Sequence, residues 1–351
     1  MRKSSHRKRI LIAGGAGFIG SNLVREFLAQ GHKVDCVDSL ITGELANLDA
    51  VRMNQDFRFI HGDIADLGIV SRLHRERYTD IYNLACPTGV PNIALLGEEM
   101  MMASSAGTLN LLHVAEQSQA RYLFASTAEA YGDPEVFPQA ESYAGNVDPV
   151  GPRSPYEEGK RFGEAITAYY AQRHGVDARI VRIFNTYGEN MSPKDTRVIP
   201  NMLLSMATGK RVVIFGDGTN TRSFLYVTDL MEGFALVMAR GQSGEVFNIG
   251  GEREMTINEL FDACRKVTGS NSKPDYQPHF IEDHRRRLPD TSKIRRLGWK
   301  PRVPIEQGLR LSYRDVRNRV SMAARDFERS VPPAVPNKPA FRGRTLRAIS
   351  Q

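Results

Sequence analysis

Tyr156 and Lys160 have the types and spacing needed for proton transfer at a hydroxyl group. They lie four residues apart in a segment with a helical pattern, so both side chains emerge on one face of the helix. An ammonium beside a phenol favours the phenolate, and we therefore expect Lys160 to lower the pKa of Tyr156 toward the range of a working base. The same spacing also occurs in ordinary exposed helix pairs, so the surrounding sequence must decide between the two interpretations.

Thr127 and Glu129 follow a predicted strand that ends at Ser126. The Thr127 hydroxyl can hydrogen-bond a reacting hydroxyl group. Glu129 is a candidate acid, base or orienting carboxylate, and the competing interpretation is a surface turn residue.

Gly14, Gly17 and Gly20 form a GxxGxxG pattern directly after the first predicted strand, at the start of a helix that runs to about Gln30. Glycine there permits a tight turn and close approach of the backbone to a pyrophosphate, and the helix N-terminus attracts the anion. The second strand ends in Asp38, where a carboxylate can accept hydrogen bonds from ribose hydroxyls, and no arginine follows to bind a 2′-phosphate. The pattern predicts NAD rather than NADP. The alternative is that the glycines only shape a loop and Asp38 caps a helix.

Two more candidates follow other strands of the same predicted sheet. Asp63, after the third strand, can meet an adenine amino group or simply cap a turn. Leu84 ends the fourth strand, at the edge where open sheets bind ligands.

The elements that must position these residues alternate short β-branched runs with longer helical patterns up to about residue 185, which is typical of a parallel sheet covered by helices. After Asn185 the rhythm changes, and a helix, a strand and a strand with a following helix are predicted at 199–208, 211–215 and 224–240. The predicted strands of the first part are Ile10–Ile12, Lys33–Val37, Arg58–Ile60, Ile81–Leu84, Tyr122–Ser126 and Arg179–Ile183.

We therefore expect an α/β fold, a Rossmann-type doubly wound parallel sheet with a smaller C-terminal substrate-binding lobe. The expected division is an NAD-binding domain at 8–188 with 224–250 returning to it, a substrate-binding lobe at 189–223 and 251–329, and flexible basic tails at 1–7 and 330–351.

Composition excludes several other classes of protein. The chain has 351 residues and a formal net charge of +7, but no basic stripe interleaved with aromatic residues, so we expect no nucleic-acid partner. No apolar run approaches the length of a membrane span. The three cysteines have no CxxC spacing, and His279 and His284 lack a metal-binding pattern, so we expect no metal site and a cytoplasmic location.

From Lys8 to about Leu309 the sequence resembles the extended short-chain dehydrogenases/reductases that modify nucleotide sugars. Within them it is most similar to the UDP-glucuronate decarboxylases, also called UDP-xylose synthases. The resemblance is carried by the segments Ala130–Pro134, Pro138–Tyr143, Gly145–Val147, Gly151–Arg161, Arg182–Gly188, Gly216–Thr219, Thr221–Phe224, Arg287–Asp290 and Leu297–Trp299.

The resemblance implies oxidation at C4 of a glucuronate ring by NAD, which makes a ketone β to the C6 carboxylate and eases loss of carbon dioxide into an enolate. Protonation at C5 and return of hydride would give UDP-xylose, unless the 4-keto intermediate is released. The expected partners are a UDP-sugar substrate and a second copy of the chain, paired as a homodimer through a helix bundle.

The resemblance also assigns roles to residues. Arg287 is expected to face the substrate near its carboxylate, while Arg222 and Asn185 match residues at the diphosphate. Alternatives are a solvated basic run for Arg287, a surface ion pair for Arg222 and a turn for Asn185. The expected catalytic residues are Thr127, Glu129, Tyr156, Lys160 and Arg287; the expected cofactor-binding residues are Gly14, Gly17, Phe18, Ile19, Gly20, Asp38, Ser39, Gly43, Asp63, Ile64, Leu84, Tyr156 and Lys160.

Some residues depart from the pattern of these decarboxylases. Met102 and Ser104 stand where lysine and asparagine are expected in the predicted helix 98–117, Ile93 replaces an aromatic residue and Ala128 a serine. The exact sugar and the release of the 4-keto intermediate therefore stay open, and so do a nucleotide-sugar 4-epimerase, a 4,6-dehydratase and a non-catalytic NAD-binding protein. The related 4,6-dehydratases resemble Thr-Asp-Glu at this strand end and use the aspartate as the acid for loss of water, so Ala128 disfavours a dehydratase. The 4-epimerases usually carry no glutamate at the position of Glu129, so Glu129 disfavours an epimerase.

Overall fold

The structure is a computed structural model that describes residues 7–192, 195–278 and 286–330. The predicted tails lie outside the described residues except for Arg7 and Ser330, as do His279 and His284.

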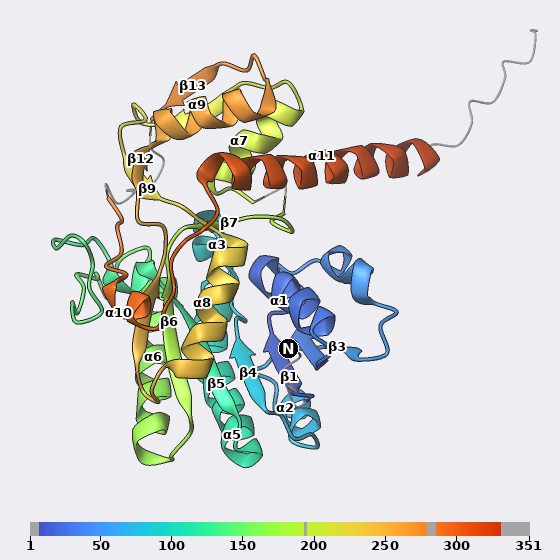
Figure 1. The fold of residues 1–351 in the computed structure, drawn as a ribbon, viewed down its shortest axis with the longest axis vertical. Helices are drawn as coiled ribbons and strands as arrows, with labels where there is room; N and C mark the ends of the chain where they lie inside the picture. The colour runs from blue at the N-terminus through green and yellow to red at the C-terminus, as the bar shows by residue number, and fades with distance from the viewer. Residues whose placement is uncertain (1–6, 193–194, 279–285, 331–351) are drawn as a thin grey trace, which may run out of the picture.

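A seven-stranded parallel sheet forms the larger part of the molecule (Figure 1), in the order β11-β6-β5-β4-β1-β2-β3. The six strands predicted from β-branched runs are confirmed, with ends shifted by one residue at most. The order reverses direction at β1 and β4, as in a doubly wound Rossmann sheet. The strands are β1 (Arg9–Ala13), β2 (Lys33–Asp38), β3 (Phe57–His61), β4 (Asp80–Asn83), β5 (Arg121–Thr127), β6 (Ala178–Ile183) and β11 (Val246–Ile249).

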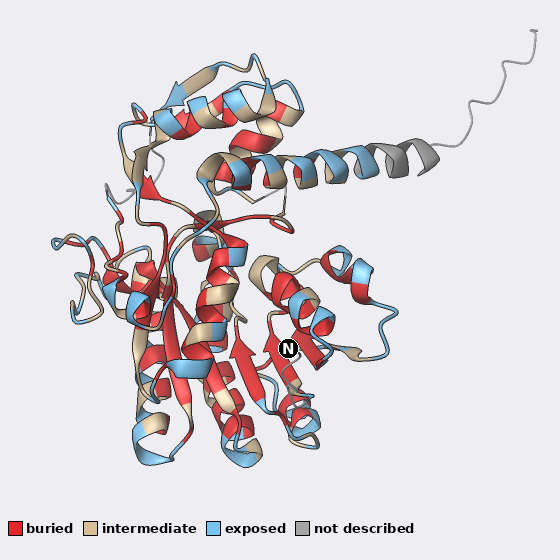
Figure 2. Ribbon diagram, viewed as in Figure 1, coloured by how far each residue is buried: buried red, intermediate tan, exposed pale blue. Residues whose placement is uncertain are grey.

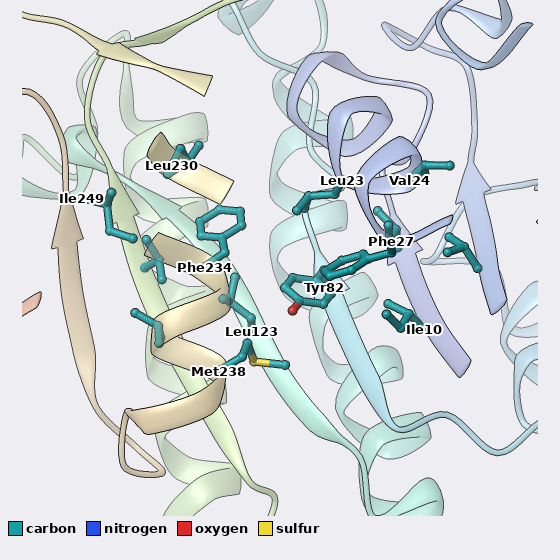
Figure 3. Packing of buried hydrophobic residues seen from close by; sticks show 14 of the residues in the cluster. Ile10, Leu23, Val24, Phe27, Tyr82, Leu123, Leu230, Phe234, Met238 and Ile249 are labelled. Atoms are coloured by element: carbon teal, nitrogen blue, oxygen red, sulfur yellow. The ribbon is translucent and has the colours of Figure 1, made fainter. Parts of the chain in front are cut away.

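Helices cover both faces of this sheet because successive residues of a strand point to opposite sides. In β1, Ile10 and Ile12 pack into one hydrophobic cluster and Leu11 and Ala13 into another. Figure 3 shows the first cluster, in which Phe27 and Phe234 from two helices meet Tyr82 of the sheet. The first face carries α1 (Phe18–Ala29), α8 (Val227–Arg240) and α10 (Ser292–Arg296); the second carries α2 (Leu67–Leu73), α5 (Thr108–Ser118) and α6 (Ser154–Arg173).

The helix predicted over 98–117 is present but changes its winding midway. It consists of α4 (Gly97–Met102), one π-helical turn η2 (Ala103–Gly107) and α5. This helix packs on α6 where the neighbouring helix has glycines: a Cβ at Gly163 would lie 2.9 Å from the Ser104 carbonyl oxygen. The short helices nearby are α3 (Val90–Leu95), η1 (Leu45–Val51) and η3 (Ala128–Tyr131).

A smaller lobe lies beyond one edge of the sheet (Figure 1) and has its own hydrophobic cluster, centred on side chains such as Met202, Leu260 and Phe261. The predicted helix 199–208, strand 211–215 and strand with helix 224–240 are confirmed. Its elements, with the short strands that lead to it, are β7 (Thr186–Tyr187), α7 (Val198–Ala207), β8 (Val212–Phe215), β9 (Thr221–Ser223), β10 (Leu225–Tyr226), β12 (Glu254–Thr256), α9 (Ile257–Thr268), β13 (Pro274–Gln277) and α11 (Ile305–Ser330).

Burial follows this plan. Except for the edge strand β3, the strands of the main sheet are buried along almost their whole length, whereas the helices expose one side (Figure 2). None of the described helices is long and apolar enough to cross a membrane. The segments that follow the parallel strands all leave from the same edge of the sheet, and most candidate residues lie at the ends of these strands or on the segments that follow them.

Candidate active site

The glycine turn has the shape of a cradle for a dinucleotide. Gly14 has φ of +78°, and a Cβ there would lie 2.9 Å from the Leu84 carbonyl oxygen and the Ala85 amide nitrogen. A Cβ at Gly20 would lie 2.1 Å from the Gly14 carbonyl oxygen. Gly17 is the N-cap of α1, and among the described residues no side chain accepts a hydrogen bond there from the free amides of the helix. These free amides and the bare backbone fit a pyrophosphate.

Asp38 lies beside this turn and is 8% exposed. Its Oδ2 accepts a hydrogen bond from the Ala16 amide and its Oδ1 one from the Leu40 amide, each 2.9 Å long. Burial raises the pKa of Asp38 above its ordinary value, and the two amides oppose that shift. A Cβ at Gly43 would come within 2.6 Å of Oδ1, so glycine keeps the carboxylate accessible.

The other predicted cofactor residues lie on the segments that follow β1, β2 and β3. Asp63 Oδ1 accepts a hydrogen bond from the Ala65 amide at 2.8 Å, so this residue does cap a turn, as one of its two interpretations had it. The Ser39 carbonyl oxygen lies 3.3 Å from His61 Nε2. Phe18 reaches the second lobe and packs against its hydrophobic cluster, and Ile19 packs on the cluster of the first sheet face. Ile64 is buried, and a Cβ added at Gly107 would collide with its Cδ1.

Tyr156 and Lys160 lie on the first two turns of α6, next to the end of β5. Lys160 is 4% exposed, donates a hydrogen bond to the Ala125 carbonyl oxygen at 2.9 Å and places Nζ 5.0 Å from the centre of the Phe124 ring. Tyr156 hydrogen-bonds with the Thr127 hydroxyl. The structure thus brings together the pair on α6 and the predicted threonine on β5.

The prediction that Lys160 lowers the pKa of Tyr156 is wrong, because the pKa of Tyr156 is raised and Lys160 is not among the main groups that shift it. Burial raises the pKa of Tyr156 most, and the nearby Cys86 raises it further; Thr127 lowers it, Glu129 raises it and Arg197 lowers it, in decreasing order of effect. The ammonium of Lys160 is bound to a carbonyl of β5 instead.

Glu129 lies between two arginines. Thr127 caps η3 by accepting a hydrogen bond from the Glu129 amide at 3.2 Å, which fixes the start of this turn. Glu129 Oε2 forms an ion pair with Arg153 and lies 3.0 Å from Arg287 Nη2. The interpretation of Glu129 as a plain surface turn residue therefore does not fit the structure.

Arg287 is 3% exposed, which removes the alternative of a solvated basic run. Its Nη1 donates to the Ala128 carbonyl oxygen at 2.6 Å. Nη2 is close to Glu129, yet among the described residues it makes no hydrogen bond of regular geometry. Burial lowers the pKa of Arg287; the charge of Glu129 opposes this, while Arg222 and Arg153 add to it. A buried guanidinium beside two other cations is a site that an anionic ligand would stabilise.

Arg222 and Asn185 approach this cluster from the second lobe and from the end of β6. Arg222 is 8% exposed on β9, and its Nη1 donates to the Thr221 carbonyl oxygen at 2.8 Å. The half-buried Asn185 follows β6, and its carbonyl oxygen accepts a hydrogen bond from the Leu225 amide at 2.9 Å.

Apart from Ala128 in η3, the departures from the family pattern lie along the α4–η2 helix and α3. Ser104 is buried, with its Oγ 3.7 Å from Cys86 Sγ, and Ile93 is also buried. Met100 is fully buried, whereas Met101 and Met102 are each 44% exposed. Met100 therefore packs inside the protein, and only its two neighbours can take part in a contact between subunits.

Sequence reasoning missed Arg153 and Cys86. Arg153 is the N-cap of α6 and bridges Glu129 and Glu157, with Nε 3.0 Å from Glu157 Oε1. Its signal was its place three residues before Tyr156, one turn away on the same helix. Cys86 lies two residues beyond Leu84 and acts on Tyr156, and nothing in its spacing marked it.

Comparisons with known proteins agree with this geometry. Residues 10–250 match the NAD dependent epimerase/dehydratase family. The chain is 41% identical over 304 residues to UDP-glucuronic acid decarboxylase 1 of Danio rerio, covering 86% of this chain and 71% of that one. It is 39% identical over 320 residues to UDP-glucuronic acid decarboxylase 6 of Arabidopsis thaliana, covering 90% of each.

Solved structures show the same fold. The UDP-glucose 4-epimerase of Thermotoga maritima, determined with UDP-glucose, superposes with a TM-score of 0.82 at 31% identity, over 89% of this chain and 99% of that one. A dTDP-glucose 4,6-dehydratase of Streptomyces venezuelae, determined with NAD, gives a TM-score of 0.81 at 32% identity, over 90% and 98%.

Proposed function

This chain belongs to the NAD dependent epimerase/dehydratase family and, within it, to the UDP-glucuronate decarboxylases of the extended short-chain dehydrogenases/reductases, and from this premise we propose that it converts UDP-glucuronic acid to UDP-xylose. The observation that carries the proposal is Glu129, held between Arg153 and the buried Arg287 beside Tyr156.

Oxidation at C4 of the sugar begins the reaction. The glycine turn, Asp38 and Lys160 would hold NAD, which would serve as the acceptor of the C4 hydride and return it later. Tyr156 takes the proton of the C4 hydroxyl, and Thr127, hydrogen-bonded to Tyr156, orients that hydroxyl. Lys160 fixes the face of α6 that carries Tyr156 against β5, through its bond to the Ala125 carbonyl oxygen.

Loss of carbon dioxide then depends on the arginine cluster. The C4 ketone lies β to the C6 carboxylate, so the electrons of the breaking bond pass into an enolate whose oxygen faces Tyr156 and Thr127. We assign Arg287 to holding the carboxylate, because its Nη2 is buried and poorly bonded. Glu129 orients Arg287 and is the candidate for proton exchange at C5. Arg222 and Asn185 are assigned to the diphosphate.

The second candidate function is a 4-epimerase or 4,6-dehydratase acting on a nucleotide sugar, as in the two structural neighbours. A dehydratase of the resembling type needs an acid where Ala128 stands. The Ala128 methyl is instead buried against Tyr131 and Phe184. This arrangement supports decarboxylation over dehydration.

The test is incubation of the protein with UDP-glucuronic acid and NAD, followed by NMR and mass spectrometry of the nucleotide sugar. We expect carbon dioxide and UDP-xylose, with or without a 4-ketopentose nucleotide. An epimerase would leave the mass of the sugar unchanged and a dehydratase would remove water. Absence of both carbon dioxide and a pentose or 4-ketopentose product would refute the proposal.

We also propose a homodimer. A shallow apolar hollow lies on the outer face of η2, α5 and α6, where Phe162 and Tyr169 are 55% and 57% exposed, and Met101 and Met102 lie on the adjoining helix. Pairing two copies through these helices would bury an apolar face that is exposed to solvent in a single copy. Sedimentation of the wild type and of a Phe162→Glu variant tests this, because a charge in the interface should give monomers. The hollow is lined by Ser105, Ala106, Leu109, Phe162, Ala165, Ile166, Tyr169 and Tyr170.

The domain division and location are proposed on the same basis. Residues 8–188 with 224–250 would hold NAD, because β11 joins the main sheet next to β6. Residues 189–223 and 251–329 would hold the UDP-sugar. The free state of Cys36, Cys86 and Cys264 supports a cytoplasmic location.

A further inference from the structure

A polar clamp joins the C-terminal helix α11 to the glycine turn at the other end of the chain. Arg319 on α11 donates through Nη2 to Asn47 Oδ1 at 2.8 Å. Asn47 lies in η1, and its Nδ2 donates to the Ala16 carbonyl oxygen at 2.8 Å. Figure 1 shows α11 extending from the second lobe above α1. Arg319 thus lies one side chain away from the turn, although it is far outside the segment that matches the family.

Ala16 is the point where three parts of the cofactor site meet. Its amide donates to Asp38 Oδ2 at 2.9 Å, and its carbonyl oxygen accepts from both Asn47 Nδ2 and the Glu44 amide, the latter at 3.1 Å. The glycine turn, Asp38 and the loop at 39–51 are therefore tied together through the backbone of one residue, Ala16. That loop carries Ser39 and Gly43, which were predicted to contact the cofactor.

The loop at 39–51 needs outside support. Leu40 has φ of +61°, a left-handed conformation that is uncommon for leucine and costs conformational energy. Asn47, only 3% exposed, is the buried anchor of the short helix that ends the loop. Without that anchor the loop has fewer contacts that oppose the strain.

Arg319 fixes which way the Asn47 amide points. A guanidinium can only donate, so it must face Oδ1, and this leaves Nδ2 directed at the Ala16 carbonyl oxygen. Arg319 is itself held from the side of the second lobe. Its Nε donates to Asp315 Oδ2 at 3.1 Å and its Nη2 also donates to Asn190 Oδ1 at 3.2 Å. The planar fork of arginine suits such a multiple contact, and lysine cannot reproduce it.

We propose that Arg319 is a positioning residue for NAD, acting through Asn47 on the Ala16 peptide and on the loop over Asp38. The proposal rests on the NAD site proposed above. It assigns part of the second lobe, through α11, to holding the cofactor rather than the UDP-sugar alone. The expected signature is a loss of NAD affinity with unchanged affinity for UDP, since Arg319 has no contact with the arginine cluster among the described interactions.

The test is calorimetric titration of NAD, and separately of UDP, into the cofactor-free wild type and the variants Arg319→Gln, Arg319→Lys and Arg317→Gln. We expect the Kd for NAD to rise about tenfold in Arg319→Gln, which is the loss of roughly one charged hydrogen bond, and to rise less in Arg319→Lys. Arg317, two residues before Arg319 on the same helix, is exposed and stacks on Tyr313, so Arg317→Gln is the matched control and should bind NAD as the wild type does.

A second variant keeps the inference testable if Arg319→Gln does not fold. Asn47→Ala removes the contact to Ala16 directly, and the double variant Arg319→Gln/Asn47→Ala should lose no more NAD affinity than Asn47→Ala alone. If the wild type binds no NAD, the proposed cofactor site itself is wrong. If the wild type binds NAD and Arg319→Gln binds it equally well, or loses NAD and UDP affinity alike, the clamp only supports the fold and the inference is overturned.

Discussion

The glycine turn and the arginine cluster lie at the same edge of the sheet but are built in opposite ways. The turn is made mainly by backbone: Gly14, Gly17 and the free amides of α1 come from one continuous segment, and the side chains of Asp38 and Asn47 bind that segment at Ala16. The cluster is made by charged side chains from separate segments, with Glu129 between Arg153 and Arg287. A backbone cradle is sensitive to added volume, whereas a charge cluster is sensitive to lost charge.

The two regions also differ in what holds them. The turn is fixed by hydrogen bonds to Ala16 and by the close approach of Gly14 to the chain at Leu84. The cluster is fixed by the ion pairs of its arginines with Glu129 and Glu157, and the buried charge of Arg287 costs free energy until an anion enters. Binding of cofactor and chemistry on the substrate should therefore respond to different substitutions.

The largest difference between loss of turnover and loss of NAD binding is expected from Tyr156→Phe. This substitution removes the phenolic hydroxyl that is proposed as the general base. Turnover of UDP-glucuronic acid should fall by about 10²–10⁴-fold because the general base is lost, while the Kd for NAD stays close to that of the wild type. Single-turnover assays and NAD titration measure the two effects. Tyr143→Phe is the control, since Tyr143 packs behind the site against Tyr131. Near-normal turnover in Tyr156→Phe would remove this residue from the mechanism.

Arg287→Met tests the cluster alone. We expect decarboxylation to fall by roughly 100-fold, because the carboxylate loses its buried cation, with little change in NAD binding. Arg286→Met is a matched control one residue away: Arg286 is exposed and paired with Glu254. The measurement is the rate of carbon dioxide release by Arg287→Met compared with that by Arg286→Met. Equal activity of the two would mean that Arg287 does not hold the substrate.

Gly43→Ala tests the turn by adding volume. The new Cβ would lie within 2.6 Å of Asp38 Oδ1, whose carboxylate is already fixed by two backbone amides and cannot move freely. We expect the Kd for NAD to rise about tenfold, a cost of roughly 1.4 kcal/mol, while turnover at saturating NAD is kept. Ala46→Ser, in the exposed part of the same loop, is the control. Unchanged NAD affinity in Gly43→Ala would place the ribose away from this carboxylate.

The contrast between the two regions explains how much the sequence could predict. The sheet and the turn were predictable because β-branched runs and glycine spacing are local signals that set backbone shape. Arg287 and Arg222 entered only through resemblance to a family, and Arg153 was missed. Their meeting depends on the second lobe folding back to the sheet edge, a contact that no local pattern encodes.

The error about Tyr156 has the same origin. Spacing on a helix showed that Tyr156 and Lys160 share a face, but not that the ammonium is occupied by the Ala125 carbonyl oxygen. Burial of the phenol and the charge of Glu129 come from other elements, and together they raise its pKa. The Arg319 clamp likewise joins residues from opposite ends of the chain, which a reading of local motifs cannot find.

The smallest expected effect is a pH dependence confined to the turn. Burial raises the pKa of Asp38 in the folded protein, so as the pH falls this carboxyl takes up a proton before an ordinary aspartate would, at about 3.9, and while the protein is still folded. Because burial favours the protonated form, the ionised Asp38 carboxylate lowers the free energy of unfolding above its pKa. Protonation of this carboxylate removes that loss. NAD affinity should move the other way, since a protonated carboxyl accepts ribose hydrogen bonds less well. Titrations of NAD at falling pH should show a gradual loss of affinity in the wild type that is absent in Asp38→Asn, whose affinity is weaker throughout. UDP affinity serves as the control, because Asp38 does not belong to the arginine cluster, and an identical pH dependence of NAD binding in Asp38→Asn would assign the effect to another group.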